Sequence, residues 1–164
     1  MKTEIVRVED LIPDPANART HSGKNLDAIK GSLAKFGQQK NIVIGPSNVV
    51  IAGNGTLMAA KELGWETLSV YRSELGGVDA RAFAVADNRT TDLSDWDFDI
   101  LGDMLTALKD EKFDLEALGF DTKELEMLMN TELPQSAYGK DLDESIADEV
   151  EWIECPECKH KWPK

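Results

Sequence analysis

Residues 50–64 have the sequence VIAGNGTLMAAKELG, and this stretch decides how the chain folds. The apolar run at 50–52 predicts a strand, the two glycines that follow predict a tight turn, and the remainder has the composition of an amphipathic helix. The first turn of a helix presents unpaired backbone N–H groups and the positive end of the helix dipole, which attract phosphate and other anions. The stretch therefore predicts a strand–turn–helix unit with an anion site at the turn.

Each residue of this turn has a ligand-binding interpretation and a structural one. Gly53 and Gly55 allow a ligand to approach the backbone closely, but many turns carry glycine for geometry alone. Thr56 is suited either to cap the helix or to bond a phosphate oxygen. Asn54 is placed to contact a ligand, and asparagine also tolerates left-handed backbone geometry. The local pattern leaves both interpretations open.

The hydrophobic periodicity on both sides of this unit predicts a mixture of strands and helices. Leu26, Ile29, Leu33 and Phe36 recur at helical spacing, and Thr122 is the predicted N-cap of the last helix. Two of the strands, 41–44 and 49–52, are close enough in sequence to form a hairpin. We predict further strands at 4–8 and 68–71, a helix that follows the glycine turn and ends at about residue 63, and helices at 25–36, 78–89, 97–108 and 122–129.

The composition indicates one domain with a short appendage. The chain has 164 residues, of which 41% are hydrophobic and 30% are charged. No apolar run approaches the ~20 residues that a membrane span needs, so we expect no membrane association. The first residues lack the apolar segment of a signal peptide, which predicts a cytoplasmic protein.

The formal net charge of −13 is unevenly distributed. Residues 1–72 carry nine Lys and Arg against seven Asp and Glu, whereas residues 73–164 carry nine against 24. The acidic second part is explained by solvation, by mimicry of nucleic acid or by a brake on non-specific DNA contact, and solvation is the commonest of these. The near-neutral first part remains suited to a local anion site.

The end of the chain has its own pattern. Residues 131–151 contain scattered acids and no periodicity, which predicts an acidic linker, and residues 152–164 form a separate CxxC tail. Cys155 and Cys158 have the spacing of a zinc half-site, and His160 is a third candidate ligand for Zn²⁺. A degenerate knuckle without metal is an equal alternative, and a redox dithiol is the less favoured one.

Four stretches together resemble one known superfamily. Residues 11–22 (LIPDPANARTHS), 36–44 (FGQQKNIVI), 50–64 and 84–97 (AVADNRTTDLSDWD) occur in the order found in the ParB/sulfiredoxin superfamily. The best match is the ParB-like N-terminal domain of phage and bacterial DNA-modification proteins. The resemblance implies an α+β fold: a small mixed sheet with helices over residues 1–76, a helical extension of the same domain over 77–130, and a zinc-knuckle-like tail.

The resemblance also implies a nucleoside triphosphate site with Mg²⁺ around the glycine turn. It places Gly53, Asn54, Gly55, Thr56 and Arg19 at the phosphates. Gln38 and Gln39 are candidates to contact the base or ribose, with a polar turn as the alternative. Similar domains usually have Gly-His-Gly-Arg at the turn, so this chain lacks both the imidazole and the guanidinium. Arginine holds phosphate by a bidentate charged contact, and Arg19, Lys40 and Arg89 are the candidates to replace it. For Arg89 a structural ion pair with Asp87 or Asp92 is the favoured alternative.

Three functions stay open at this point. The first is a module that binds a nucleotide or DNA and serves DNA modification, partition or regulation, in contact with a DNA-modification enzyme or as a homodimer. The second is a nucleotide-dependent phosphotransferase or a nuclease that uses the same pocket. The third is a phage factor whose acidic part contacts a host protein. The missing arginine and histidine favour the first, because phosphoryl transfer depends on holding developing charge.

Overall fold

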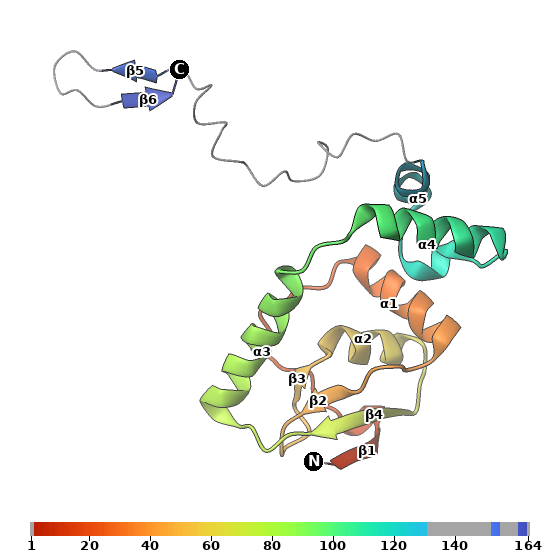
Figure 1. Cartoon of the computed structure of the whole chain (residues 1–164). Coiled ribbons are helices and arrows are strands. Elements are labelled where there is room, and N and C mark those ends of the chain that lie inside the picture. Colours follow the sequence, from red (N-terminus) through yellow and green to blue (C-terminus); the bar gives the residue numbers. More distant parts are fainter. Residues whose placement is uncertain (1, 131–151, 155–160, 164) are drawn as a thin grey trace. The chain divides into compact units, whose positions relative to one another are not determined.

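The computed structural model of the protein describes residues 2–130, 152–154 and 161–163. The chain divides into two compact units, residues 1–129 and 130–164. None of the helices in the described ranges is both long enough and apolar enough to cross a bilayer. In the first unit (Figure 1) the order is β1 (Lys2–Arg7), the 3-10 turn η1 (Val8–Asp10), α1 (Gly23–Phe36), β2 (Ile42–Ile44), β3 (Val50–Ala52), α2 (Asn54–Glu62), β4 (Thr67–Arg72), α3 (Gly77–Asp92), α4 (Phe98–Asp110), the 3-10 turn η2 (Leu115–Leu118) and α5 (Thr122–Met129).

The four strands of the first unit form a mixed sheet in the order β1-β4-β2-β3. β1 pairs with β4 and β2 pairs with β3 in antiparallel fashion, whereas β2 and β4 are parallel. A parallel pair needs a crossover connection, and α2 lies within the one that joins these strands. The predicted small mixed sheet with helices, and the predicted hairpin of its second and third strands, are therefore confirmed.

The main hydrophobic core lies between this sheet and the helices α1 and α2, which Figure 1 shows on one side of the sheet. β4 contributes alternate residues, because successive side chains of a strand point to opposite faces. Burying each large aliphatic side chain contributes about 1.5–3 kcal/mol, so the core holds both ends of the glycine turn in place. Its fully buried members include Leu11, Ile44, Val50, Leu57, Leu68 and Val70.

Arg72, at the end of β4, joins three parts of the sheet. Its Nε and Nη2 donate hydrogen bonds to the Glu4 carboxylate at 2.9 and 3.2 Å. Nη2 also donates to Asn48 Oδ1 at 2.9 Å, and Nη1 donates to the carbonyl oxygen of Gly45 at 3.1 Å. This half-buried guanidinium therefore fixes the β2–β3 turn against β1 and β4.

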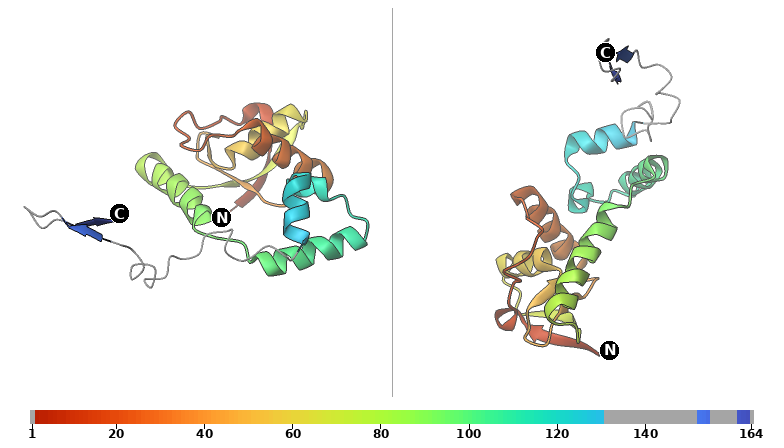
Figure 2. Two further views of the ribbon diagram at one scale, coloured as in Figure 1. Left: turned by 90° about the horizontal axis from the view of Figure 1, so that it is seen from above. Right: turned by 90° about the vertical axis from the view of Figure 1, so that its left-hand side faces the viewer.

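The helical extension is anchored to α1. α3 buries none of its side chains completely and leads from the core to the α4–α5 pair, as Figure 2 shows. α4 and α5 share a small second core of Leu101, Leu105 and Leu125. The rings of Phe36 and Phe113 stack at 6.0 Å, and η2 packs against α1. The extension therefore packs against α1 within the first compact unit, although its small core is distinct from the main one.

α5 begins with a reciprocal capping pair. The backbone N–H of Glu124 donates to Asp121 Oδ1 at 2.9 Å, and the backbone N–H of Asp121 donates to Glu124 Oε2 at 2.7 Å. The prediction that Thr122 caps this helix is wrong by one residue. Asp121 outcompetes the threonine because its side chain reaches the third helical N–H while Glu124 returns the bond.

The pKa of the Asp121 carboxyl is lowered, first by the backbone N–H of Glu124 and then by the Lys24 ammonium at 3.1 Å. A carboxyl with a lowered pKa stabilises the fold above its unfolded-state pKa, and this contribution is lost as pH falls through the folded-state pKa. We expect Lys24→Met to raise the pKa of Asp121 only part of the way to its ordinary value, because the hydrogen bond from the Glu124 N–H, which is the larger cause of the lowering, remains. An NMR titration of the carboxyl measures this, and an ordinary pKa in the unchanged protein would contradict it.

The second unit is described only in its two strands. β5 (Trp152–Glu154) pairs with β6 (Lys161–Pro163) in antiparallel fashion, with Ile153 opposite Trp162. The predicted metal ligands Cys155, Cys158 and His160 lie outside the described residues, as does the predicted linker at 131–151. The zinc knuckle therefore stays a prediction.

Candidate functional site

The first turn of α2 has no side-chain cap. Its N-cap residue is Gly53, with φ 98° and ψ 25°. The Gly53 carbonyl oxygen accepts the first hydrogen bond of the helix from the backbone N–H of Leu57, at 3.0 Å. The three N–H groups between them, of Asn54, Gly55 and Thr56, have no acceptor within the helix. They give this end of α2 a set of donors together with the positive end of the helix dipole.

Packing explains why the turn contains two glycines. A Cβ on Gly53 would lie 2.5 Å from Ile42 Cγ2. A Cβ on Gly55 would lie 2.7 Å from His21 Cε1 and 3.0 Å from Ile29 Cδ1. The glycines therefore have a structural purpose whether or not a ligand binds at the turn.

Both polar atoms of the buried Asn54 side chain are bonded to the backbone. Its Oδ1 accepts a hydrogen bond from the backbone N–H of Asp14 at 3.0 Å, and its Nδ2 donates to the carbonyl oxygen of Val50 at 3.2 Å. The side chain thereby fixes the loop that follows η1 to the first residue of β3. For a ligand, Asn54 offers its backbone N–H rather than its amide.

Arg19 reaches from this loop to α3. Asn17 shapes the loop locally, since its Oδ1 accepts from the Arg19 N–H at 3.2 Å and its Nδ2 donates to the Arg19 carbonyl oxygen at 2.8 Å. The Arg19 guanidinium lies 2.9 Å from Asp92 Oδ1, and its Nη1 lies 3.5 Å from Asn88 Oδ1. Asp92 thus pairs with Arg19 rather than with Arg89, the partner expected from the sequence.

These elements enclose a pocket of about 160 Å³ at the start of α2. A second pocket of about 530 Å³ shares Arg19 and Asn88 with it and adds Arg89. Ligand pockets commonly measure about 300–1,000 Å³, so the two together have the size for a nucleotide and the smaller one suits its phosphates. Five of the seven predicted binding residues line the smaller pocket, which is lined by Asn17, Arg19, His21, Ile29, Ile51, Ala52, Gly53, Asn54, Gly55, Thr56, Asp87 and Asn88.

The other two predicted residues lie elsewhere and bond the backbone. Gln38 accepts from the Ser69 N–H at 2.8 Å and donates to the Ser69 carbonyl oxygen at 2.7 Å, so its amide bonds β4 just before the residues that pair with β2. Gln39 Nε2 donates to the carbonyl oxygen of Phe36 at 2.5 Å and closes the end of α1. Lys40 does not line either pocket. The pocket is therefore built without these three side chains.

Asp87, Asn88 and His21 line the smaller pocket, although the sequence did not single them out as binding residues. His21 Nδ1 forms a hydrogen bond of 2.8 Å with Asn25 Oδ1, so this ring nitrogen is used within the protein. Asp87 offers a carboxylate of the kind that holds Mg²⁺ jointly with substrate phosphates. In the described parts of the chain, no three His, Cys, Asp or Glu side chains cluster as a metal site. The residues therefore fit a metal that arrives with a nucleotide.

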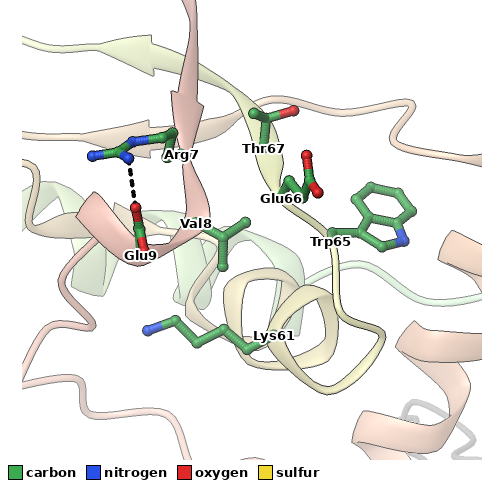
Figure 3. A pocket seen from close by; sticks show the side chains of 7 residues that line it. All are labelled: Arg7, Val8, Glu9, Lys61, Trp65, Glu66 and Thr67. Carbon is green, nitrogen blue, oxygen red and sulfur yellow. Dashed lines mark ion pairs between the residues drawn. The ribbon is translucent and has the colours of Figure 1, made fainter.

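A pocket of about 480 Å³ lies at the opposite end of α2. Figure 3 shows its lining, in which Arg7 is paired with Glu9 at 2.6 Å while Lys61 and Trp65 project apart. This is the C-terminal, negative end of the helix dipole, which disfavours anions. This pocket is therefore less suited to an anion than the start of α2 is.

The fold and the turn together define a small α+β domain with an open helix start. A family model described as the ParB-methyltransferase HTH domain matches residues 99–159. The ParB-like nuclease domain-containing protein YnaK of Escherichia coli K12 is 33% identical over 63 residues, which cover 38% of this chain and 72% of that protein. The chain therefore belongs to the ParB-like family.

A solved structure shows the same fold. The C-terminally truncated chromosome-partitioning protein ParB of Caulobacter crescentus, complexed with CTP-gamma-S, matches with a TM-score of 0.72. The sequences are 17% identical, and the match covers 91% of this chain and 87% of that one. At this identity the likeness establishes the architecture, and the site of this chain has to be argued from its own residues.

Proposed function

We propose that the protein is a ParB-like module that binds a nucleoside triphosphate with Mg²⁺ at the first turn of α2. The observation that carries the proposal is the convergence of three unbonded helical N–H groups and the Arg19 guanidinium on one pocket. The ParB of Caulobacter crescentus, which has this fold, is complexed with a CTP analogue. In this chain the base is left unassigned.

In this arrangement the phosphates occupy the smaller pocket and the nucleoside occupies the larger one. Arg19 lines both pockets and lies within reach of a phosphate oxygen as well as of Asp92. The charges of Arg19 and Arg89 are offset by those of Asp87 and Asp92, so the lining does not neutralise a triphosphate alone. Bound Mg²⁺ supplies the missing positive charge, with Asp87 as its protein ligand.

We further propose that nucleotide binding serves DNA modification, partition or regulation. The family matched over residues 99–159 is described as a helix-turn-helix domain, a class of motif that commonly enters the major groove. Over residues 98–129, however, nine Asp and Glu oppose three Lys. Few phosphates can be neutralised by such a surface, so the chain's own DNA affinity should be weak and should fall with salt. A phage or bacterial origin, a cytoplasmic location and a modification enzyme as partner remain parts of this proposal.

Titration calorimetry with ATP, CTP and GTP in the presence of Mg²⁺ tests the nucleotide site. We expect Arg19→Gln to weaken binding roughly ten- to hundredfold, because a charged hydrogen bond contributes about 1.5–3 kcal/mol. Lys40→Gln is the matched control and should leave the affinity unchanged, since Lys40 lies outside both pockets. Absence of heat with every nucleotide would refute the site. Gly55→Val is unsuitable as a probe because its side chain would displace His21.

A further inference from the structure

Helix α4 has a wider apolar face than its neighbours cover. Leu101 and Leu105 are buried in the second core. Ile100 and Met104, one helical turn apart, are each 58% exposed. Residues four apart lie side by side on a helix, so these two side chains form one apolar strip beside the buried face.

The segment that leads into α4 exposes further large apolar side chains. Leu93 is 64% exposed and Trp96 is 63% exposed, although the Trp96 ring lies 6.4 Å from that of Phe120. Single exposed apolar residues are ordinary, but several within a dozen residues indicate a surface that another molecule covers. We refer to Leu93, Trp96, Ile100 and Met104 as the α4 patch.

The charged residues within the stretch that carries the α4 patch all have one sign. Residues 90–108 contain no Lys or Arg. Asp99 and Asp103 lie one turn apart on the helix, next to the strip formed by Ile100 and Met104. The carboxylates interleaved with the patch are those of Asp95, Asp97, Asp99 and Asp103, whereas that of Asp92 is paired with Arg19 at 2.9 Å.

This charge decides which kind of molecule fits the surface. DNA phosphates and anionic lipid headgroups would be repelled by the carboxylates. A second copy of the chain would bring the same carboxylates to the contact. A basic amphipathic helix complements both features, because its apolar face covers the patch while its lysines and arginines meet the acidic rim.

We propose that the α4 patch is a docking site for a basic amphipathic helix of another protein. The helix-turn-helix region then contacts a protein partner at this surface, where the carboxylates would repel DNA. None of the four patch residues lines the proposed nucleotide pockets, although the neighbouring Asp92 lines the larger one. The docking role gives the exposed apolar side chains and the surrounding acids a common purpose.

A synthetic helix can stand in for the partner. The probe is a fluorescent leucine–lysine peptide of roughly 18 residues, with all leucines on one helical face and enough length to form a helix. Anisotropy titration of the full chain should show binding that weakens about tenfold between low and high salt, as expected for partly screened charges. Ile100→Ser combined with Met104→Ser should weaken binding about tenfold or more.

Two controls separate this site from non-specific attraction. Ile5→Ser removes an equally exposed side chain from β1 and should leave the affinity unchanged, with folding of every variant checked by thermal melting. Asp99→Lys combined with Asp103→Lys should transfer the preference to a leucine–glutamate peptide. The proposal is overturned if the unchanged chain binds both peptides equally or if the Ile100 and Met104 variant binds normally. A dimer of the unchanged chain that the same variant dissociates would also overturn it.

Discussion

Replacing Gly53 with alanine is expected to lower the free energy of unfolding by about 2–4 kcal/mol, the sum of backbone strain and overpacking. The residue has a φ of +98°, which L side chains rarely adopt. The new Cβ would also lie 2.5 Å from Ile42 Cγ2 and 2.9 Å from Ile42 Cβ. Because Ile42 is buried in the central part of the sheet, it has little room to move. Urea unfolding of Gly53→Ala measures the loss.

Gly64→Ala separates the two causes. Gly64 has a φ of +71°, but a Cβ built on it meets no heavy atom within 4 Å. Gly64→Ala should therefore lower the free energy of unfolding only through backbone strain, by about 1 kcal/mol. Equal decreases in the free energy of unfolding at the two positions would show that the Ile42 contact contributes nothing. Ile42 in β2 would then be able to move aside, although it is buried.

The elements that the sequence predicts well are those whose signals are local. The apolar run 50–52, the glycine turn and the following helix occur within 15 consecutive residues, and α2 ends at Glu62, within a residue of the expected position. The N-cap of α5 was misplaced because Asp121 and Thr122 are both good caps. Only the bond from the Glu124 N–H, together with the returning carboxylate, selects the aspartate.

The candidate site was harder to predict because its parts come from distant segments. Arg19 and Asn88 are 69 positions apart, and nothing in either local sequence indicates that α3 lies against the first loop. The resemblance predicts a ligand contact for Gln38, whereas its amide bonds the backbone of Ser69, 31 positions away. Asn54 was placed correctly at the turn, but its side chain serves the loop at Asp14. Long-range hydrogen bonds of this kind leave no periodic signal in a sequence.

The turn retains the backbone donors of an anion site but carries threonine where similar domains have arginine. Thr56 is half-buried, lies third in α2 and lines the smaller pocket. A threonine hydroxyl gives one neutral hydrogen bond, worth about 1 kcal/mol, whereas a charged donor contributes about 1.5–3 kcal/mol. Thr56→Arg should therefore tighten triphosphate binding roughly tenfold, and by more where the guanidinium contacts two phosphate oxygens.

Thr56→Met has a comparably long side chain without charge, so it shows whether filling the pocket alone changes affinity. We expect no gain from it, and we expect the gain from Thr56→Arg to shrink as salt screens the charge. Calorimetry of both variants with the nucleotide that binds the unchanged chain provides the comparison, and thermal melting confirms that each is folded. If Thr56→Arg binds no tighter than the unchanged protein, the start of α2 is not where the phosphates lie. The unbonded N–H groups of Asn54, Gly55 and Thr56 would then face solvent as an ordinary helix end.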